Sequence, residues 1–171
     1  MRLPGIFAVV AAAFALLAPA AQAKTIRLHW LEQTPAGFGY PVVVFNVRSI
    51  AYDGRSWRVS AAVTNRSKSP IKIRTSGTST TIPRFGLRLP PSICKYHNYP
   101  SCLSGGAVLV PASSYAPQPP AVLNPGQRWS GTFAGRAPLR EGMRIAITFG
   151  YFVAPAQHKA FSWITSHAVT L

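Results

Sequence analysis

Apolar residues recur at every second position along most of this chain, and no other feature constrains its fold as strongly. The longest run places five of them on one face of a strand: Ile145, Ile147, Phe149, Tyr151 and Val153. Shorter runs lie within 25–31, 42–47, 56–65, 71–73, 85–89, 107–110, 129–133 and 161–171. A period of two is typical of half-buried β-strands, and no amphipathic helix is evident after residue 23. The chain is therefore predicted to be all-β.

Turn-forming residues separate these runs and set the expected number of strands. The clearest turn signals are Asp53-Gly54, Pro90-Pro91, Asn124-Pro125-Gly126 and Glu141-Gly142. The proline-rich stretch 111–120 is interpreted as a loop, because alternation resumes directly after it. Seven to nine short strands, each with one apolar face, predict an antiparallel β-sandwich.

The N-terminal residues have the composition of a secretory signal peptide. Arg2 supplies the positive start, Ile6 to Leu17 the apolar core, and Ala21-Gln22-Ala23 a cleavage site of small residues. A retained membrane anchor is the alternative, but the apolar core is shorter than the ~20 residues that a bilayer span requires. We therefore expect a signal peptide over 1–23, a single domain over 24–171, and export to the periplasm or the cell exterior.

Positive charge dominates the composition. The chain has 18 Lys and Arg residues against 3 Asp and Glu, which gives a net charge of +15. Such a charge attracts anionic partners such as lipopolysaccharide, teichoic acid, nucleic acid or acidic lipid. A genome that favours arginine codons would also raise the arginine content, although it would not explain the shortage of acids. Both explanations remain open at the level of sequence.

The three acids, Glu32, Asp53 and Glu141, are too few and too scattered for most carboxylate chemistry. Paired-carboxylate hydrolysis needs two acids at one bond, and a site for a hard cation needs several oxygen ligands. The chain also has no G-x-S-x-G serine motif and no phosphate-binding P-loop motif. The sequence therefore predicts a protein that is not an enzyme and needs no cofactor. A small secreted hydrolase or a metal-binding protein is the alternative.

Both cysteines lie in the segment CKYHNYPSC, at positions 94 and 102. In an exported chain, two cysteines this close in sequence predict a disulfide between Cys94 and Cys102. On the loop-entropy model such a bridge stabilises the fold by roughly 2.5 kcal/mol. A soft-metal site formed by Cys94, His97 and Cys102 is the alternative, but a closed zinc site needs a fourth ligand.

One hairpin can be predicted to the level of register. A three-residue loop, Tyr52-Asp53-Gly54, places Val47 opposite Val59 and continues the apolar pairs toward Val43 and Val63. A two-residue loop would mix apolar and polar faces. The chosen register sets Arg48 opposite Arg58 on the outer face, where two like charges repel and could hold an anion.

The strand-turn-strand that follows is rich in cations and free of acids. Together with Arg48 it supplies six candidate anion-binding residues: Arg48, Arg58, Arg66, Lys68, Lys72 and Arg74. They form one patch only if the strand at 71–74 joins the sheet that contains the 43–63 hairpin. The alternative is that these charges only keep the outer faces of the strands soluble. Nucleic acid is not favoured as a partner, because most aromatic residues fall on apolar faces and are unavailable for base stacking.

Two segments carry a family resemblance. The run SWRVSAAVTNRSKSPIKI resembles the strand-turn-strand of bacterial secreted Ig-like domains, and LNPGQRWSGTFAG is similar to their Leu-x-Pro-Gly turn and following strand. The likeness extends loosely to the BsuPI-type proteinase-inhibitor fold. The resemblance implies an Ig-like sandwich and carries over no functional residue. We therefore expect a secreted binding or structural module of the cell envelope that engages an anionic polymer or a protein partner.

Overall fold

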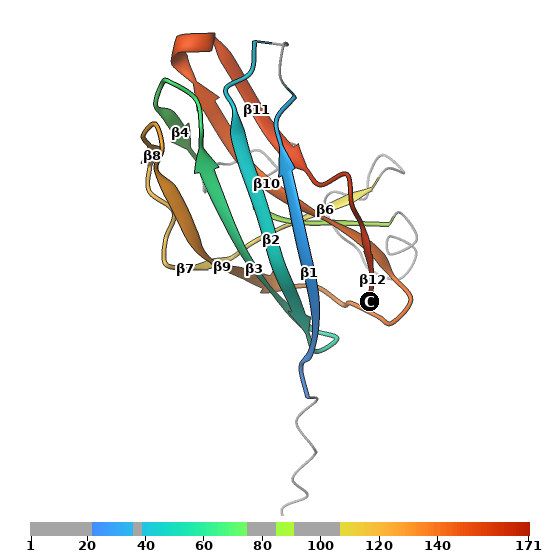
Figure 1. Ribbon diagram of the computed structural model, residues 1–171. Coiled ribbons are helices and arrows are strands. Elements are labelled where there is room, and N and C mark those ends of the chain that lie inside the picture. The colour runs from blue at the N-terminus through green and yellow to red at the C-terminus, as the bar shows by residue number, and fades with distance from the viewer. Residues whose placement is uncertain (1–21, 36–38, 75–84, 91–106) are drawn as a thin grey trace, which may run out of the picture.

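The computed structural model describes residues 22–35, 39–74, 85–90 and 107–171, which form two antiparallel sheets packed face to face (Figure 1). The five-stranded sheet contains, in spatial order, β1 (Lys24–Gln33), β2 (Val43–Tyr52), β3 (Ser56–Asn65), β9 (Arg128–Arg136) and β7 (Ser114–Ala116). The seven-stranded sheet contains β6 (Val108–Pro111), β5 (Gly86–Leu89), β10 (Arg144–Ala154), β4 (Ile71–Ile73), β8 (Val122–Leu123), β11 (Lys159–Ile164) and β12 (Val169–Thr170). The predicted all-β sandwich is confirmed.

The strands outnumber the seven to nine expected because several of them are only two to four residues long, among them β4, β8 and β12. Strand β10 organises the second sheet, since it pairs with β4, β5, β11 and β12 along its length. A short 3-10 helix, η3 (Pro155–Gln157), connects β10 to β11. Within the described ranges no helix is long and apolar enough to cross a membrane.

The core lies between the two sheets and is unusually aromatic. Five phenylalanines contribute fully buried rings to it: Phe45, Phe85, Phe133, Phe149 and Phe152. They come from both sheets and contact one another edge-on or tilted, which aromatic quadrupoles favour. The alternating apolar residues of the sequence thus account for the core, because each strand turns its apolar side inward.

The predicted hairpin between β2 and β3 has the right faces but the wrong register. Val47 and Val59 are both buried, as predicted, yet Val47 pairs with Ala61, and Val59 pairs with Ile50. A β-bulge at Arg48 shifts the register by one residue between Val47 and Ser49. Arg48 and Arg58 are therefore not opposite each other, because Arg58 pairs with Ala51.

The physical reason lies in the sequence of β2 itself. Phe45 and Val47 occupy odd positions, whereas Ile50 and Tyr52 occupy even positions, and all four are buried. A regular strand would expose one of these pairs, so an extra residue must be accommodated between them. The connection has three residues, as predicted, but it is displaced by one: Asp53, Gly54 and Arg55 join the strands, and Tyr52 pairs with Trp57. The Asp53 N–H donates to the Ser56 carbonyl at 3.2 Å.

A second change of face occurs in β10. The sequence predicted Tyr151 and Val153 on the buried side, but Phe152 and Ala154 are buried there instead. Gly150 has a φ of +93°, a conformation that glycine adopts at little cost, and the register with β11 shifts between Phe149 and Phe152. This bulge lets Phe149 and Phe152 both enter the core.

The chain crosses from the first sheet to the second directly after β3, at the turn around Asn65. The Asn65 side chain is fully buried and uses all of its polar capacity. Its Nδ2 donates to the carbonyls of Ser69 and Leu123 at 2.9 and 2.8 Å, and its Oδ1 accepts from the N–H and hydroxyl of Ser67. The backbone N–H of Gly126 also donates to the Asn65 carbonyl at 2.7 Å. The asparagine turn and the Asn124-Pro125-Gly126 turn, far apart in sequence, therefore form one unit.

Candidate functional site

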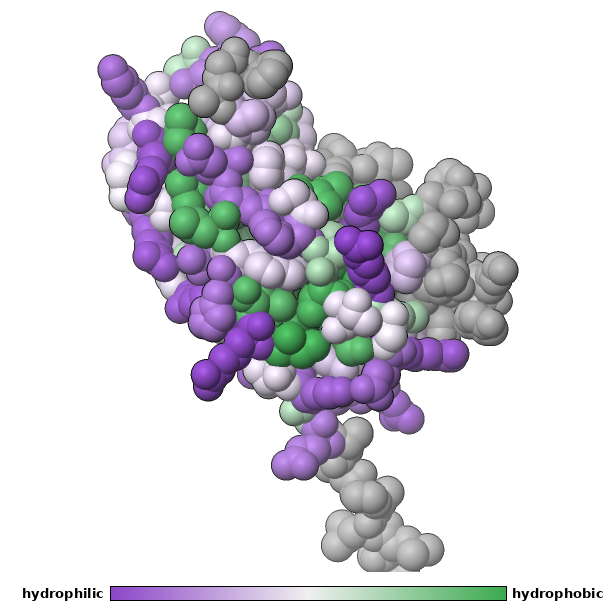
Figure 2. Space-filling view, turned by 45° about the vertical axis from the view of Figure 1, so that its right-hand side comes forward, coloured by the Kyte–Doolittle hydropathy of each residue, from purple (hydrophilic) through white to green (hydrophobic). Residues whose placement is uncertain are grey.

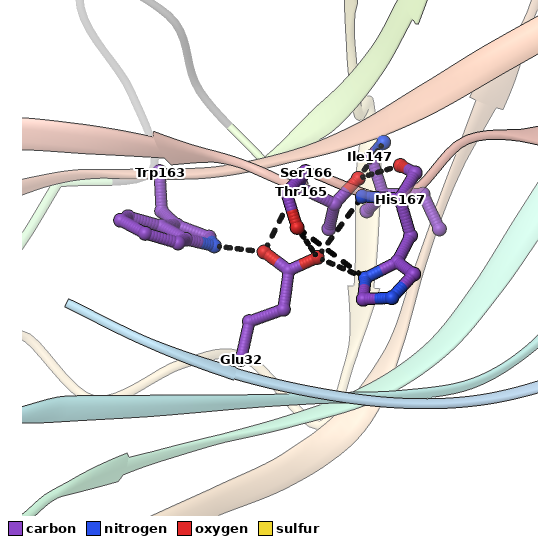
Figure 3. A network of polar contacts seen from close by, with 6 residues as sticks. All are labelled: Glu32, Ile147, Trp163, Thr165, Ser166 and His167. Carbon is purple, nitrogen blue, oxygen red and sulfur yellow. Dashed lines mark hydrogen bonds and ion pairs between the residues drawn. The ribbon is translucent and has the colours of Figure 1, made fainter. Parts of the chain in front are cut away.

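A polar network in the described residues joins the two sheets along the side where β1 lies close to β11 (Figure 3). Glu32, on the inner side of β1, accepts hydrogen bonds from the Trp163 indole at 2.8 Å and from the Ser166 amide at 3.1 Å. The Ser166 hydroxyl and the His167 amide bind the same carboxylate at 3.0 and 3.2 Å. The His167 Nδ1 lies 2.7 Å from Glu32 Oε1, which forms an ion pair when the imidazole is protonated.

Packing holds these groups in place. The Trp163 ring stacks on the buried Phe45 ring with centroids 5.4 Å apart, and the Trp30 ring stacks on His167 at 5.5 Å. Thr165 fixes the turn between β11 and β12, because its hydroxyl donates to the His167 carbonyl and accepts from the Ile147 N–H. The Glu32 side chain is 7% exposed, whereas His167 is 55% exposed. The carboxylate is therefore an internal tie between β1 and the β11–β12 turn.

Two opposing effects act on the pKa of the Glu32 carboxyl. Burial is the largest single influence and raises the pKa, because it disfavours the charged form. The hydrogen bonds from the His167 side chain, from the Ser166 and His167 amides and from the Trp163 indole together outweigh burial. The pKa of Glu32 is consequently below its ordinary value of 4.5.

The juxtaposition of Ser166, His167 and Glu32 resembles a catalytic triad in composition but not in geometry. In a triad the serine hydroxyl and the carboxylate bind opposite nitrogens of the imidazole, so that one nitrogen takes the serine proton while the carboxylate orients the ring and stabilises the imidazolium through the other. Here the Ser166 hydroxyl lies 3.4 Å from Nδ1, the same nitrogen that contacts Glu32, and it also contacts Glu32 directly. This arrangement stabilises the carboxylate rather than activating the serine.

Glu32→Gln is expected to lower the free energy of unfolding by about 2 kcal/mol at pH 7, because an amide presents N–H groups to donors that now contact a carboxylate. The contribution of the ionised carboxylate is fully present above its unfolded pKa and is lost as the pH falls through the lowered folded pKa. The difference between variant and wild type should therefore shrink below about pH 4. Urea unfolding at several pH values measures both effects, and a constant difference down to pH 3 would contradict them.

The structure separates the six predicted anion-binding residues. Arg48 and Arg58 belong to the five-stranded sheet, whereas Lys72 and Arg74 belong to or directly follow β4 in the other sheet. Arg66 and Lys68 lie exposed in the connection between the sheets. Because the chain crosses between sheets after β3, the continuous patch considered from the sequence does not form. A role for any of these residues in binding an anion stays a prediction.

Arg48 has a structural role that the sequence did not indicate. From its bulge, the guanidinium reaches across β3, donates to the Ala61 carbonyl at 3.0 Å and contacts the Ser130 hydroxyl of β9. The Arg48 side chain therefore lies along the outer side of the sheet, where it donates a hydrogen bond to a carbonyl of the adjacent strand. Arg58, in contrast, alternates with buried Trp57 and Val59 and projects outward.

Strand register places further arginines on the same outward side as Arg58. Arg27 pairs with Ser49, which pairs with Ser60, which in turn pairs with Thr132, so these four residues lie side by side across the sheet. Arg128 and Arg136, at the two ends of β9, face outward opposite Thr64 and Ser56. We call this surface the arginine face, defined by Arg27, Arg48, Arg58, Arg128 and Arg136. The residues between the arginines are mostly small, such as Ser60, Ala62, Ser130 and Ala134.

A shallow pocket lies at one end of the arginine face. It has a volume of about 350 Å³ and lies between Arg58 and Arg136, over the backbone of Gly135. Asp53 and several serines also line it. A second hollow of about 370 Å³, on the other sheet, is lined by Arg88 and Arg144 and borders residues that the structure does not describe.

Apolar side chains are visible along the side of the sandwich on which β1, β11 and β12 lie, and hydrophilic side chains project around them (Figure 2). Ile26, Leu28 and Trp30 of β1 contribute to this border, where they are only partly buried against the core. The Glu32 network therefore ties the two sheets together at a place where apolar packing alone leaves the core partly open to solvent.

The predicted disulfide and its metal alternative cannot be placed. Cys94, His97 and Cys102 all lie outside the described residues. Within the ranges that the structure does describe, no three His, Cys, Asp or Glu side chains are grouped so as to hold a metal ion. Comparison of the chain with protein-family models, with curated proteins and with solved structures gives no significant match.

Proposed function

We propose that this protein is a secreted, non-enzymatic binding module of the cell envelope that engages an anionic polymer through the arginine face. The observation that carries the proposal is the chemistry of that face. Its β-strands present five arginines outward, and no Asp, Glu, Phe, Tyr or Trp side chain of these described strands shares the outward side.

In the described part of the chain, the acids have contacts other than ion pairs with this face. Glu32 contacts His167, Glu141 pairs with Lys24, and Asp53 accepts hydrogen bonds from Ser56 and from the Arg55 amide. None of the five arginines of the face has an ion pair in the described part of the chain. A surface whose guanidinium groups form no ion pair concentrates anions by its field, and guanidinium forks match phosphate and sulfate oxygens.

The nature of the surface narrows the class of polymer. Binding of single-stranded nucleic acid would use aromatic rings on which bases stack, and the outward rows of these strands have none. Small hydroxyl-bearing residues between the arginines favour contacts to charged oxygens instead. We therefore propose a phosphate- or sulfate-bearing envelope polymer rather than nucleic acid. We do not propose the hydrolase alternative, because the Ser166 hydroxyl contacts the same His167 nitrogen, Nδ1, that Glu32 contacts.

A charge-swap experiment tests this function. The double variant Arg58→Glu with Arg128→Glu changes the arginine face, and Lys72→Glu with Arg74→Glu makes the same change of net charge on the other sheet. Retention on heparin or polyphosphate is measured against salt concentration. If the face binds the polymer, the slope of log affinity against log salt should fall in magnitude by roughly 0.7 to 0.9 for each lost contact in the first variant only. Equal losses in both variants would show that net charge alone matters.

A further inference from the structure

The pocket on the arginine face has the features of a site for one specific anionic group. Arg58 pairs with Ala134 across β3 and β9, and Arg136 pairs with Ser56 two residues away, so the two arginines are diagonal neighbours on one side of the sheet. Backbones of diagonal neighbours on adjacent strands are roughly 7–8 Å apart, a separation that long side chains can span. The two guanidinium groups can therefore approach a ligand from two directions.

Both arginines are free to bind. In the described part of the chain neither guanidinium takes part in a hydrogen bond or an ion pair, unlike Arg48. Ser113 and Ser114 are exposed at the wall of the pocket, and the only described bond of the Ser113 hydroxyl is a long one of 3.4 Å to the Ala134 carbonyl. The pocket is also lined by Ala23, which belongs to the expected signal peptide, and by Ala51, Tyr52, Trp57, Ala134 and Gly135.

Asp53 is the one acid in the pocket lining, and its state decides which anions fit. Hydrogen bonds from the Ser56 hydroxyl and amide and from the Arg55 amide lower its pKa to about 2, so it is ionised at neutral pH. Its negative charge offsets part of the field of the arginines. A weakly charged group would gain little here, whereas a group with several charged oxygens can satisfy two guanidinium forks together.

We propose that the pocket between Arg58 and Arg136 binds a tetrahedral oxyanion, a phosphate or sulfate group. A planar carboxylate accepts hydrogen bonds close to its own plane, whereas a tetrahedral group offers oxygens in several directions, to two guanidinium forks and to a serine hydroxyl. The pocket volume of about 350 Å³ lies at the lower end of the range for small-ligand sites. This inference rests on the proposed function and identifies where a charged group of the polymer would lie.

Titration of the uniformly labelled mature protein with inorganic phosphate, followed by amide NMR at constant ionic strength, tests the pocket. Saturable shifts are expected at Ser56, Ser114 and Ala134. Arg58→Gln and Arg136→Gln should each weaken binding about tenfold, the loss expected for one charge-assisted contact. Arg128→Gln, on the same face but outside the pocket, should stay within about twofold. Shifts that do not saturate, or equal losses in all three variants, would overturn the proposal.

The source of the group and the proposed function are tested separately. If the group is carried by a polymer, polyphosphate should bind at least about tenfold more tightly per phosphate than inorganic phosphate, because neighbouring contacts raise the effective concentration. Equal affinity would indicate a site for the free ion. If inorganic phosphate does not bind in the pocket, but the Arg58→Glu and Arg128→Glu double variant still weakens retention on heparin, the pocket proposal is overturned and the proposed function is supported. If inorganic phosphate binds in the pocket, but the double variant does not change retention on heparin, the pocket proposal is supported and the proposed function is overturned.

Discussion

Asn65→Ala is expected to lower the free energy of unfolding by about 3 kcal/mol, although the substitution removes only a small side chain. The loss follows from the partners that remain. The carbonyls of Ser69 and Leu123 lose their donor, and the Ser67 N–H loses its acceptor, in a region where the asparagine itself is fully buried. Buried groups left without a hydrogen bond cost more than the net value of the bond itself.

Urea denaturation and thermal unfolding measure this loss, which corresponds to a decrease in Tm of roughly 10 °C for a domain of this size. Asn46→Ala is a matched control, since Asn46 lies on the outward side of β2, and it should change stability by less than about 0.5 kcal/mol. Asn65→Asp distinguishes the contribution of the side-chain donor from that of the acceptor, because aspartate keeps the contact to Ser67 but cannot donate to the two carbonyls. A cost of Asn65→Ala no larger than that of Asn46→Ala would contradict the role of this turn.

The strands and their inward faces could be predicted from the sequence because alternation is a local property. Val43, Phe45, Val59, Val63 and Ile147 are all buried, as their positions in apolar stripes indicated. The register was not predictable by the same rule. A bulge changes whether the odd-numbered or the even-numbered residues of a strand face inward. A register predicted for a regular strand therefore fails beyond Arg48 in β2 and beyond Gly150 in β10.

A signal for both bulges was nevertheless present. In β2 the apolar positions change from odd at Val47 to even at Ile50, and in β10 the adjacent Tyr151 and Phe152 compete for the inward side, with Gly150 before them. A change of parity inside one apolar run, next to glycine or to a long polar residue, indicates an inserted residue. The third bulge, in β1 between Arg27 and Trp30, contains His29 at a φ of +52°, and nothing in its local sequence indicated this.

The Glu32 network could not be predicted, because its members are separated by more than 130 residues along the chain. The sequence indicated only that the acids are few and scattered, which argued against carboxylate chemistry and said nothing about their contacts. In the structure each of the three acids has a defined contact, and none of them forms an ion pair with an arginine of the arginine face. The division of the basic residues between two sheets likewise depended on where the chain crosses, which alternation does not encode.

Phe85→Ala should have the largest effect of any single substitution considered, about 4–5 kcal/mol in the free energy of unfolding. The Phe85 ring is fully buried directly before β5. Five aromatic rings surround it at centroid distances of 5.4 to 6.2 Å: Tyr115, Trp129, Phe133, Phe149 and Phe152. Because these rings come from both sheets, Phe85 connects them, and its removal leaves a cavity that rigid neighbours cannot easily close.

Unfolding in guanidinium chloride with an unchanged m-value gives this loss directly. Phe85→Leu, which keeps most of the volume, should cost only about 1.5 kcal/mol, and Leu31→Ala, at a side chain that is 66% exposed, should cost less than about 0.5 kcal/mol. A cost of Phe85→Ala close to that of Phe85→Leu would mean that the core rearranges around the smaller residue. Because a domain of this kind is stable by only about 5–15 kcal/mol, the alanine variant is expected to approach the limit at which the sandwich no longer folds.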